Sequence, residues 1–139
     1  MGFWSPSDTG VGYQCDISEN DFEKGIFYFE ALCMASTLTW LTKEFSRKHR
    51  DCSKPVKVII YCDNTNTVLV FNILKASEKY NKILVHTANL LIKFNIQLKV
   101  DHIPGEKNMV ADLLLRENTT KLKSLLPTLS ISRFTPPSL

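Results

Sequence analysis

The stretch Val56-Lys57-Val58-Ile59-Ile60-Tyr61-Cys62-Asp63 is almost continuously apolar up to its last residue. A short run of this kind, rich in β-branched residues and preceded by a proline, is typical of a strand that is buried on both faces. We therefore predict a β-strand over 56–62 with helices packed against it. Asp63 follows at its carboxyl end, which is the edge where open α/β sheets gather their sites.

A long helix is predicted ahead of this strand. Its apolar residues recur at alternating spacings of four and three, which is the core stripe of an amphipathic helix. They are Phe27, Ala31, Met34, Leu38, Leu41 and Phe45. The predicted helix spans about 29–46, and the basic run at 43–50 lies at the negative end of its dipole.

The first residues of the chain predict short strands. Phe3 and Trp4, then Tyr13, flank a segment rich in Gly, Pro and Ser, which indicates a hairpin with its turn over 5–12. A third strand is expected around 25–29. Because hairpin strands are antiparallel, the sheet is expected to be mixed.

The chain after Asp63 alternates between helix and strand patterns. We predict a short helix to Leu74, capped by Asp63 or Asn64, and a longer helix over 77–94. A strand with one buried face follows over 96–102, and then a helix over 109–117. These elements give an α/β fold, a mixed sheet flanked by helices, in a domain over 1–118. Residues 119–139 are expected to form a loose tail or linker.

Composition limits the function only broadly. The 139 residues are 44% apolar and carry a net charge of +3, so a polyanionic partner is permitted but not required. The four cysteines form no C-x-x-C pair, which favours free thiols in a reducing, intracellular compartment. No apolar run is long enough to span a bilayer, so no membrane association is expected.

Three carboxylates are candidate metal ligands. Asp63 follows a buried strand, Glu30 lies in the first turn of the long helix, and Asp112 lies early in the last helix. Each has an ordinary alternative role, as a helix cap or as a solvated residue near a helix dipole. If the three converge, their oxygens favour Mg²⁺, with Mn²⁺ as a substitute. Paired ions of this kind hydrolyse phosphodiesters.

His102 is the fourth candidate. It lies two residues before Pro104-Gly105, so its imidazole is expected on a loop near the carboxylates, where it could contact a substrate or leaving group. The alternative is a purely structural role at the end of a strand.

Three motifs in this order resemble the ribonuclease H domain of retrotransposon polyproteins. The matching stretches are Ile26-Phe27-Tyr28-Phe29-Glu30-Ala31-Leu32, Tyr61-Cys62-Asp63-Asn64-Thr65-Asn66-Thr67, and His102-Ile103-Pro104-Gly105 with Asn108, Ala111, Asp112 and Arg116. The flanks, 2–14 and 131–137, also resemble such polyproteins, so the likeness covers nearly the whole chain. It implies an RNase H-like sheet, metal ligands at Glu30, Asp63 and Asp112, and a mobile histidine at His102.

Two positions depart from the family pattern. The first catalytic aspartate of the family belongs to a strand that would lie upstream of Met1, so the N-terminal strand is expected to be missing. Asp8 in Ser7-Asp8-Thr9-Gly10 imitates that motif, but the preceding Trp4-Ser5-Pro6 is a poor strand. Leu115 also replaces the usual serine before Arg116.

The resemblance implies a magnesium-dependent endonuclease that hydrolyses RNA in RNA:DNA hybrids, with reverse transcriptase or integrase modules as neighbours. Basic residues such as Lys75, Lys79 and Lys82 would contact phosphates, or simply form a solvated face. The alternative function is a degenerate, non-catalytic module that binds nucleic acid or packs against other domains.

Overall fold

The structure is a computed structural model that describes residues 1–5, 11–17 and 19–139. Its strands are β1 (Gly2–Trp4), β2 (Val11–Gln14), β3 (Val56–Cys62), β4 (Ile96–His102) and β5 (Ser130–Arg133). Its helices are α1 (Ile26–Arg47), α2 (Thr65–Ile73), α3 (Asn81–Lys93), α4 (Met109–Leu115) and α5 (Thr119–Leu125). This mixture confirms the predicted α/β class. Asp8 lies outside the described residues.

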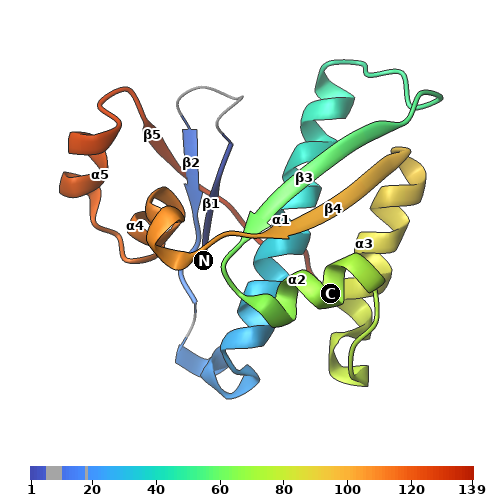
Figure 1. The fold of residues 1–139 in the computed structure, drawn as a ribbon, viewed down its shortest axis with the longest axis horizontal. Helices are drawn as coiled ribbons and strands as arrows, with labels where there is room; N and C mark the ends of the chain where they lie inside the picture. Colours follow the sequence, from blue (N-terminus) through green and yellow to red (C-terminus); the bar gives the residue numbers. More distant parts are fainter. Residues whose placement is uncertain (6–10, 18) are drawn as a thin grey trace.

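The strands form two sheets rather than the single mixed sheet that we predicted. β1 pairs antiparallel with β2, and β2 pairs parallel with β5. β3 and β4 form a separate parallel pair, in register from Val56↔Ile96 to Cys62↔His102. Figure 1 shows β1 and β3 as the neighbouring edges of the two sheets. Among the described residues no strand joins them.

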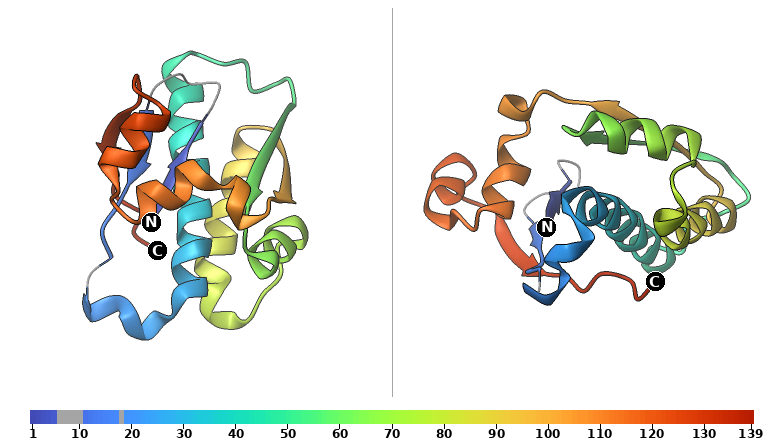
Figure 2. Two further views of the ribbon diagram at one scale, coloured as in Figure 1. Left: turned by 60° about the vertical axis from the view of Figure 1, so that its left-hand side comes forward. Right: turned by 90° about the horizontal axis from the view of Figure 1, so that it is seen from below.

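Helix α1 lies at the centre of the molecule, with β1 and β2 on one side and α3 on the other (Figure 2). Ala31, Met34 and Leu38 of the predicted stripe are buried, and the outer members of the stripe, Phe27, Leu41 and Phe45, are partly buried. The main core joins this face to α2, α3 and β4 through Phe71, Ile83 and Val100. A helix with this periodicity therefore organises the fold, as its sequence predicts.

The predicted third strand around 25–29 is wrong. Glu19–Lys24 forms a 3₁₀-helix, and α1 begins at Ile26. Gly25 has a φ of 81°, a left-handed conformation that glycine adopts without strain. The aromatic residues at 27–29 favour a strand by propensity, but the packing of Phe29 into the core stripe keeps them helical.

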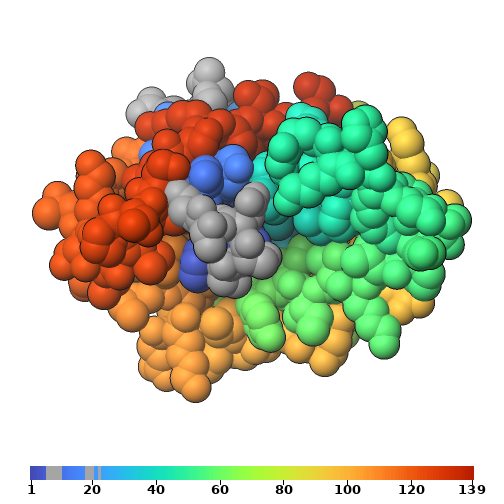
Figure 3. Space-filling view, turned by 90° about the horizontal axis from the view of Figure 1, so that it is seen from above, coloured from blue at the N-terminus to red at the C-terminus, as the bar shows by residue number. Residues whose placement is uncertain are grey.

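The expectation of a loose tail over 119–139 is also wrong. Residues 119–125 form α5 and residues 130–133 form β5, which extends the N-terminal sheet. Leu122 and Leu129 are buried with Leu113 and Leu114 of α4 in a second core. Figure 3 shows this red C-terminal segment packed against the blue N-terminal strands. The tail is part of the fold.

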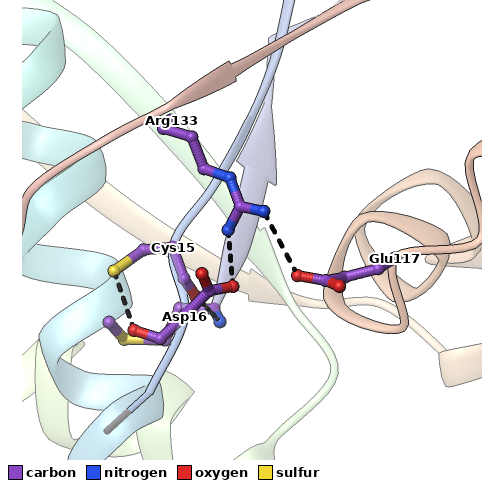
Figure 4. Close-up of polar contacts among 5 residues, drawn as sticks. Cys15, Asp16, Glu117 and Arg133 are labelled. Atoms are coloured by element: carbon purple, nitrogen blue, oxygen red, sulfur yellow. Dashed lines mark hydrogen bonds and ion pairs between the residues drawn. The ribbon is translucent and has the colours of Figure 1, made fainter.

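Polar contacts also tie the tail to the first sheet. The Arg133 guanidinium pairs with Asp16 and, at 3.5 Å, with Glu117 (Figure 4). The Asp16 contact holds the pKa of that carboxyl below its ordinary value. Because all three side chains are more than half exposed, this network contributes little to the stability of the fold.

Strand β3 is not buried on both faces as predicted. Ile59 is 51% exposed and Tyr61 is 59% exposed, while the other face of the strand is only half-buried. The pattern of an interior strand thus occurs on a strand whose outer face and one edge are uncovered within the described chain. By contrast, β4 buries Ile96 and Val100 on one face, as predicted.

The outer edge of β4 is covered by a side chain. The Asn72 amide on α2 donates to the Val100 carbonyl (2.8 Å) and accepts from the Val100 N–H (2.9 Å). Val100 is only 1% exposed, so both backbone groups need partners inside the protein. Asn72 thus replaces a neighbouring strand at this point.

We expect Asn72→Ala to lower the free energy of unfolding by about 2–3 kcal/mol, because it leaves two buried backbone groups unsatisfied. Urea denaturation measures the change. Asn66→Ala, an exposed position on the same helix, is the matched control. Equal stability of the two variants would contradict the role assigned to Asn72.

Candidate carboxylate site

Glu30 lies in the first turns of α1 on a partly buried surface. Its carboxylate accepts a hydrogen bond of 3.3 Å from the hydroxyl of Thr67 on α2. Thr67 is fully buried. The contact joins the two helices and fixes the position of one candidate ligand.

Asp63 lies directly after β3, at its carboxyl end, as the sequence predicts. Its neighbour Asn64, not Asp63, caps α2, since the Asn64 side chain accepts from the Thr67 N–H at 3.0 Å. Asp63 is therefore an exposed carboxylate that the helix cap does not use. One of its oxygens lies beside Gly105, 3.8 Å from where a Cβ would stand. The turn after β4 thus borders the Asp63 carboxylate.

Glu30 and Asp63 are close enough to influence each other. Partial burial raises the pKa of Glu30, the negative charge of Asp63 raises it further, and the Thr67 hydrogen bond partly offsets these effects. Burial and the same two carboxylates also raise the pKa of the Cys62 thiol. The carboxyl end of β3 is therefore a locally negative site on a half-buried surface.

Asp112 and His102 are not part of this pair. Asp112 lies in α4 and forms an ion pair of 3.1 Å with Arg116, one turn further along the helix. His102 is the last residue of β4 and its side chain is exposed. Over the described ranges, no group of three or more His, Cys, Asp or Glu side chains is placed to hold a metal ion. The structure thus brings together two of the four predicted residues.

Thr67 belongs to the second motif of the resemblance, but the sequence analysis gives it no role in the site. Its position three residues after the cap residue Asn64 gives a local signal for the capping hydrogen bond. Nothing local indicates that its hydroxyl reaches Glu30, because that contact joins residues 37 positions apart.

Two basic residues, Arg50 just after α1 and Lys79 just before α3, have partners inside the fold. The Arg50 guanidinium donates to the Phe94 carbonyl at 2.7 Å and lies over the ring of Phe45. The ammonium of Lys79 lies over the ring of Tyr80, 4.9 Å from its centre. These contacts give the basic residues structural roles whether or not they also meet a phosphate.

No helix in the described residues is long and apolar enough to cross a membrane.

The two carboxylates are side chains of the kind that a hydrated magnesium ion takes as ligands. Mg²⁺ keeps several waters and is commonly held through one or two carboxylates. Glu30 and Asp63 are the residues that would hold it. Thiols are poor ligands for it, and Cys62 keeps its proton because its pKa is raised. A second ion held by Asp112 would need a rearrangement of the Arg116 pair.

The fold and the site define a mixed α/β protein with two neighbouring carboxylates at the end of a parallel strand pair. Comparison with models of protein families, with curated proteins and with solved structures finds no match for the chain.

We expect Glu30→Gln to stabilise the fold near neutral pH. Because the folded-state pKa of Glu30 is raised, ionising it disfavours folding once the pH exceeds the ordinary value of about 4.3. The gain should be less than about 1 kcal/mol, since the half-exposed carboxylate is screened by water. It should vanish below about pH 4, where the carboxyl is protonated in both states.

Thermal unfolding at several pH values measures this difference between Glu30→Gln and the parent chain. Glu106→Gln, an exposed position near the same site, is the control. A stability gap that does not depend on pH would contradict the effect assigned to Glu30.

Proposed function

We propose that the chain is an RNase H-like fragment of a retroelement polyprotein, descended from a metal-dependent endonuclease that hydrolyses RNA in RNA:DNA hybrids. The observation that carries the proposal is the neighbouring Glu30 and Asp63 at the carboxyl end of β3. They are the two metal ligands that the first two motifs of the resemblance imply.

The surroundings of this pair add support. Gly105 of the third motif lies beside Asp63, so part of each motif lies near this point of the fold. The order of helix, strand and turn along the chain agrees with the resemblance. The exposed His102 at the start of this turn is free to meet a substrate from solvent.

The chemistry follows from the residues that are present. Glu30 and Asp63 would hold Mg²⁺, which stabilises negative charge on the phosphate and lowers the pKa of a bound water. Thr67 positions the Glu30 carboxylate through its hydroxyl. His102, exposed at the end of β4, would donate or accept a proton at a leaving oxygen. Such a site selects a substrate by the shape and phosphates of a hybrid rather than by its sequence.

The proposal is tested by cleavage of a labelled RNA:DNA hybrid in the presence of Mg²⁺. Asp63→Asn should lower the cleavage rate by at least about a hundredfold, because it removes a charged ligand without changing the size of the side chain. Glu78→Gln, an exposed carboxylate on another surface, should leave the rate unchanged. Cleavage that survives Asp63→Asn, or that does not need a divalent ion, would contradict the proposal.

The same assay should include a form of the chain extended upstream of Met1, because the resemblance implies a further ligand there. Cleavage by the extended form alone would place the complete active site in that longer protein. If neither form cuts the hybrid, the nuclease proposal fails.

A non-catalytic module is the alternative, and the position of Asp112 favours it. Asp112 pairs with Arg116 instead of joining the other two carboxylates. A degenerate module would still bind nucleic acid or pack against other domains. Binding of the uncut hybrid that weakens with salt, with no cleavage by either form, would support this alternative.

A further inference from the structure

The outer face of the β3–β4 pair carries a strip of side chains that point away from the core. The opposite face brings Ile60 and Val100 into the core around α1. Because the strands are parallel and in register, every second residue of each lies on the outer face. These six residues form the outer strip: Lys57, Ile59, Tyr61, Gln97, Lys99 and Asp101. Figure 1 shows the two strands in front of α1, so the strip is turned toward the viewer.

Tyr61 is the aromatic residue of the outer strip. Its side chain is more than half exposed, and no other ring or cation among the described residues lies over it. Ile59, also more than half exposed, precedes it on the same face. Uncovered aromatic rings of this kind are the platforms on which single-stranded nucleic acids stack their bases. A base in a duplex already stacks on its neighbours, so the ring favours a single strand.

The charges of the strip favour an anionic partner. Lys57 forms no ion pair with the described residues. Lys99 pairs with Asp101 at 3.0 Å, which neutralises the one carboxylate of the six side chains. The strip also begins beside a basic segment, because residues 48–57 include four lysine or arginine side chains and one carboxylate, Asp51. A phosphate chain at the amino end of β3 therefore meets positive charge.

The size of the strip distinguishes between two kinds of partner. Each strand has seven residues, and the pair presents an outer face of about 200–250 Å². A stable protein interface buries about 800 Å² on each partner, so the strip is too small to hold a protein by itself. From Lys57 to Tyr61 the strip extends about 13 Å, a length that a few nucleotides cover.

We infer that the outer strip binds single-stranded nucleic acid, with a base stacked on Tyr61 and phosphates at Lys57 and Lys99. The inference rests on the proposed function only for the class of partner, and it adds the surface and the single-stranded form. Tyr61 lies two residues before Asp63, so a strand bound along the strip approaches the carboxylate pair from the basic end of β3. The strip thus holds unpaired strand beside the candidate site.

Fluorescence anisotropy with a labelled oligo(dT) of about ten nucleotides tests the inference. The buffer contains EDTA, so that neither a metal ion nor cleavage contributes. Tyr61→Ala should weaken binding about tenfold, because it removes the stacking surface. Tyr61→Phe keeps the ring and should bind as the parent chain does. Circular dichroism of each variant shows whether the fold is retained, as expected for an exposed position.

The salt dependence of binding counts the phosphate contacts. Lys57→Gln should reduce the slope of log affinity against log salt concentration by about 0.7, the value for one phosphate contact on a single strand. Lys123→Gln, at an exposed position on α5, is the matched control and should leave the slope unchanged.

Weaker binding by Tyr61→Ala alone of the two tyrosine variants, with a reduced slope for Lys57→Gln alone of the two lysine variants, would establish the inference. Equal binding by Tyr61→Ala and the parent chain, equal slopes for both lysine variants, or tighter binding of the same oligonucleotide as a duplex would overturn it. Absence of binding at low salt would overturn it as well. Because the assay contains no divalent ion, its result is separate from that of the hybrid-cleavage test, and either proposal can fail while the other stands.

Discussion

Deleting residues 119–139 should destabilise the protein by about 4–6 kcal/mol, which is most of the stability of a small domain. The deletion removes buried Leu122 and Leu129, exposes Leu114, and leaves β2 without its outer strand. Far-UV circular dichroism during urea denaturation measures the loss. A truncated chain as stable as the parent would restore the view of this segment as a linker.

A point substitution shows how much of that destabilisation comes from the loss of buried side chains rather than from the shortening of the chain. Leu122→Ala should cost about 2–4 kcal/mol because Leu122 is 1% exposed in the second core. Leu125→Ala lies on the same helix at an exposed position and should change stability little. Equal effects of the two substitutions would show that α5 does not pack as described.

Phe71→Ala should lower the free energy of unfolding by about 3–5 kcal/mol, the range for a buried aromatic truncation. Phe71 is 2% exposed and lies in the main core with residues of α1, α3 and β4. The measurement is again urea denaturation, now with Leu69→Ala, an exposed position on the same helix, as the control. A loss no larger than that of the control would contradict the packing of α2 onto this core.

Local pattern predicted the elements whose stability comes from a single buried face. The stripe on α1 and the alternation in β4 both appear as predicted, because each residue's burial follows from its period. The apolar run of β3 predicted burial on both faces, which is wrong, because such a run shows that a strand can be buried but not which elements pack against it. The tail was missed because Ser130–Arg133 becomes a strand only by pairing with β2.

The candidate site was predictable only in part. The order of motifs placed Asp63 at a strand end, where the structure has it. Glu30 was expected in the first turn of the long helix, but α1 begins at Ile26, so Glu30 lies after its first turn. Their proximity to each other, and the contact of Thr67 with Glu30, depend on how α1 packs against α2. Asp112 was expected to join them, but a local ion pair with Arg116 satisfies it within its own helix. Metal binding by this candidate site stays a prediction.

The parallel pairing of β5 with β2 has a consequence for how the protein folds. Val11 pairs with Ser130 and Gln14 pairs with Arg133, so the first sheet joins the two ends of the chain. During synthesis, β1 and β2 leave the ribosome long before their outer neighbour exists. The second core can therefore close only once Leu122, Leu129 and β5 have been made, as a slow, non-local step, while α1 and the β3–β4 unit can already form.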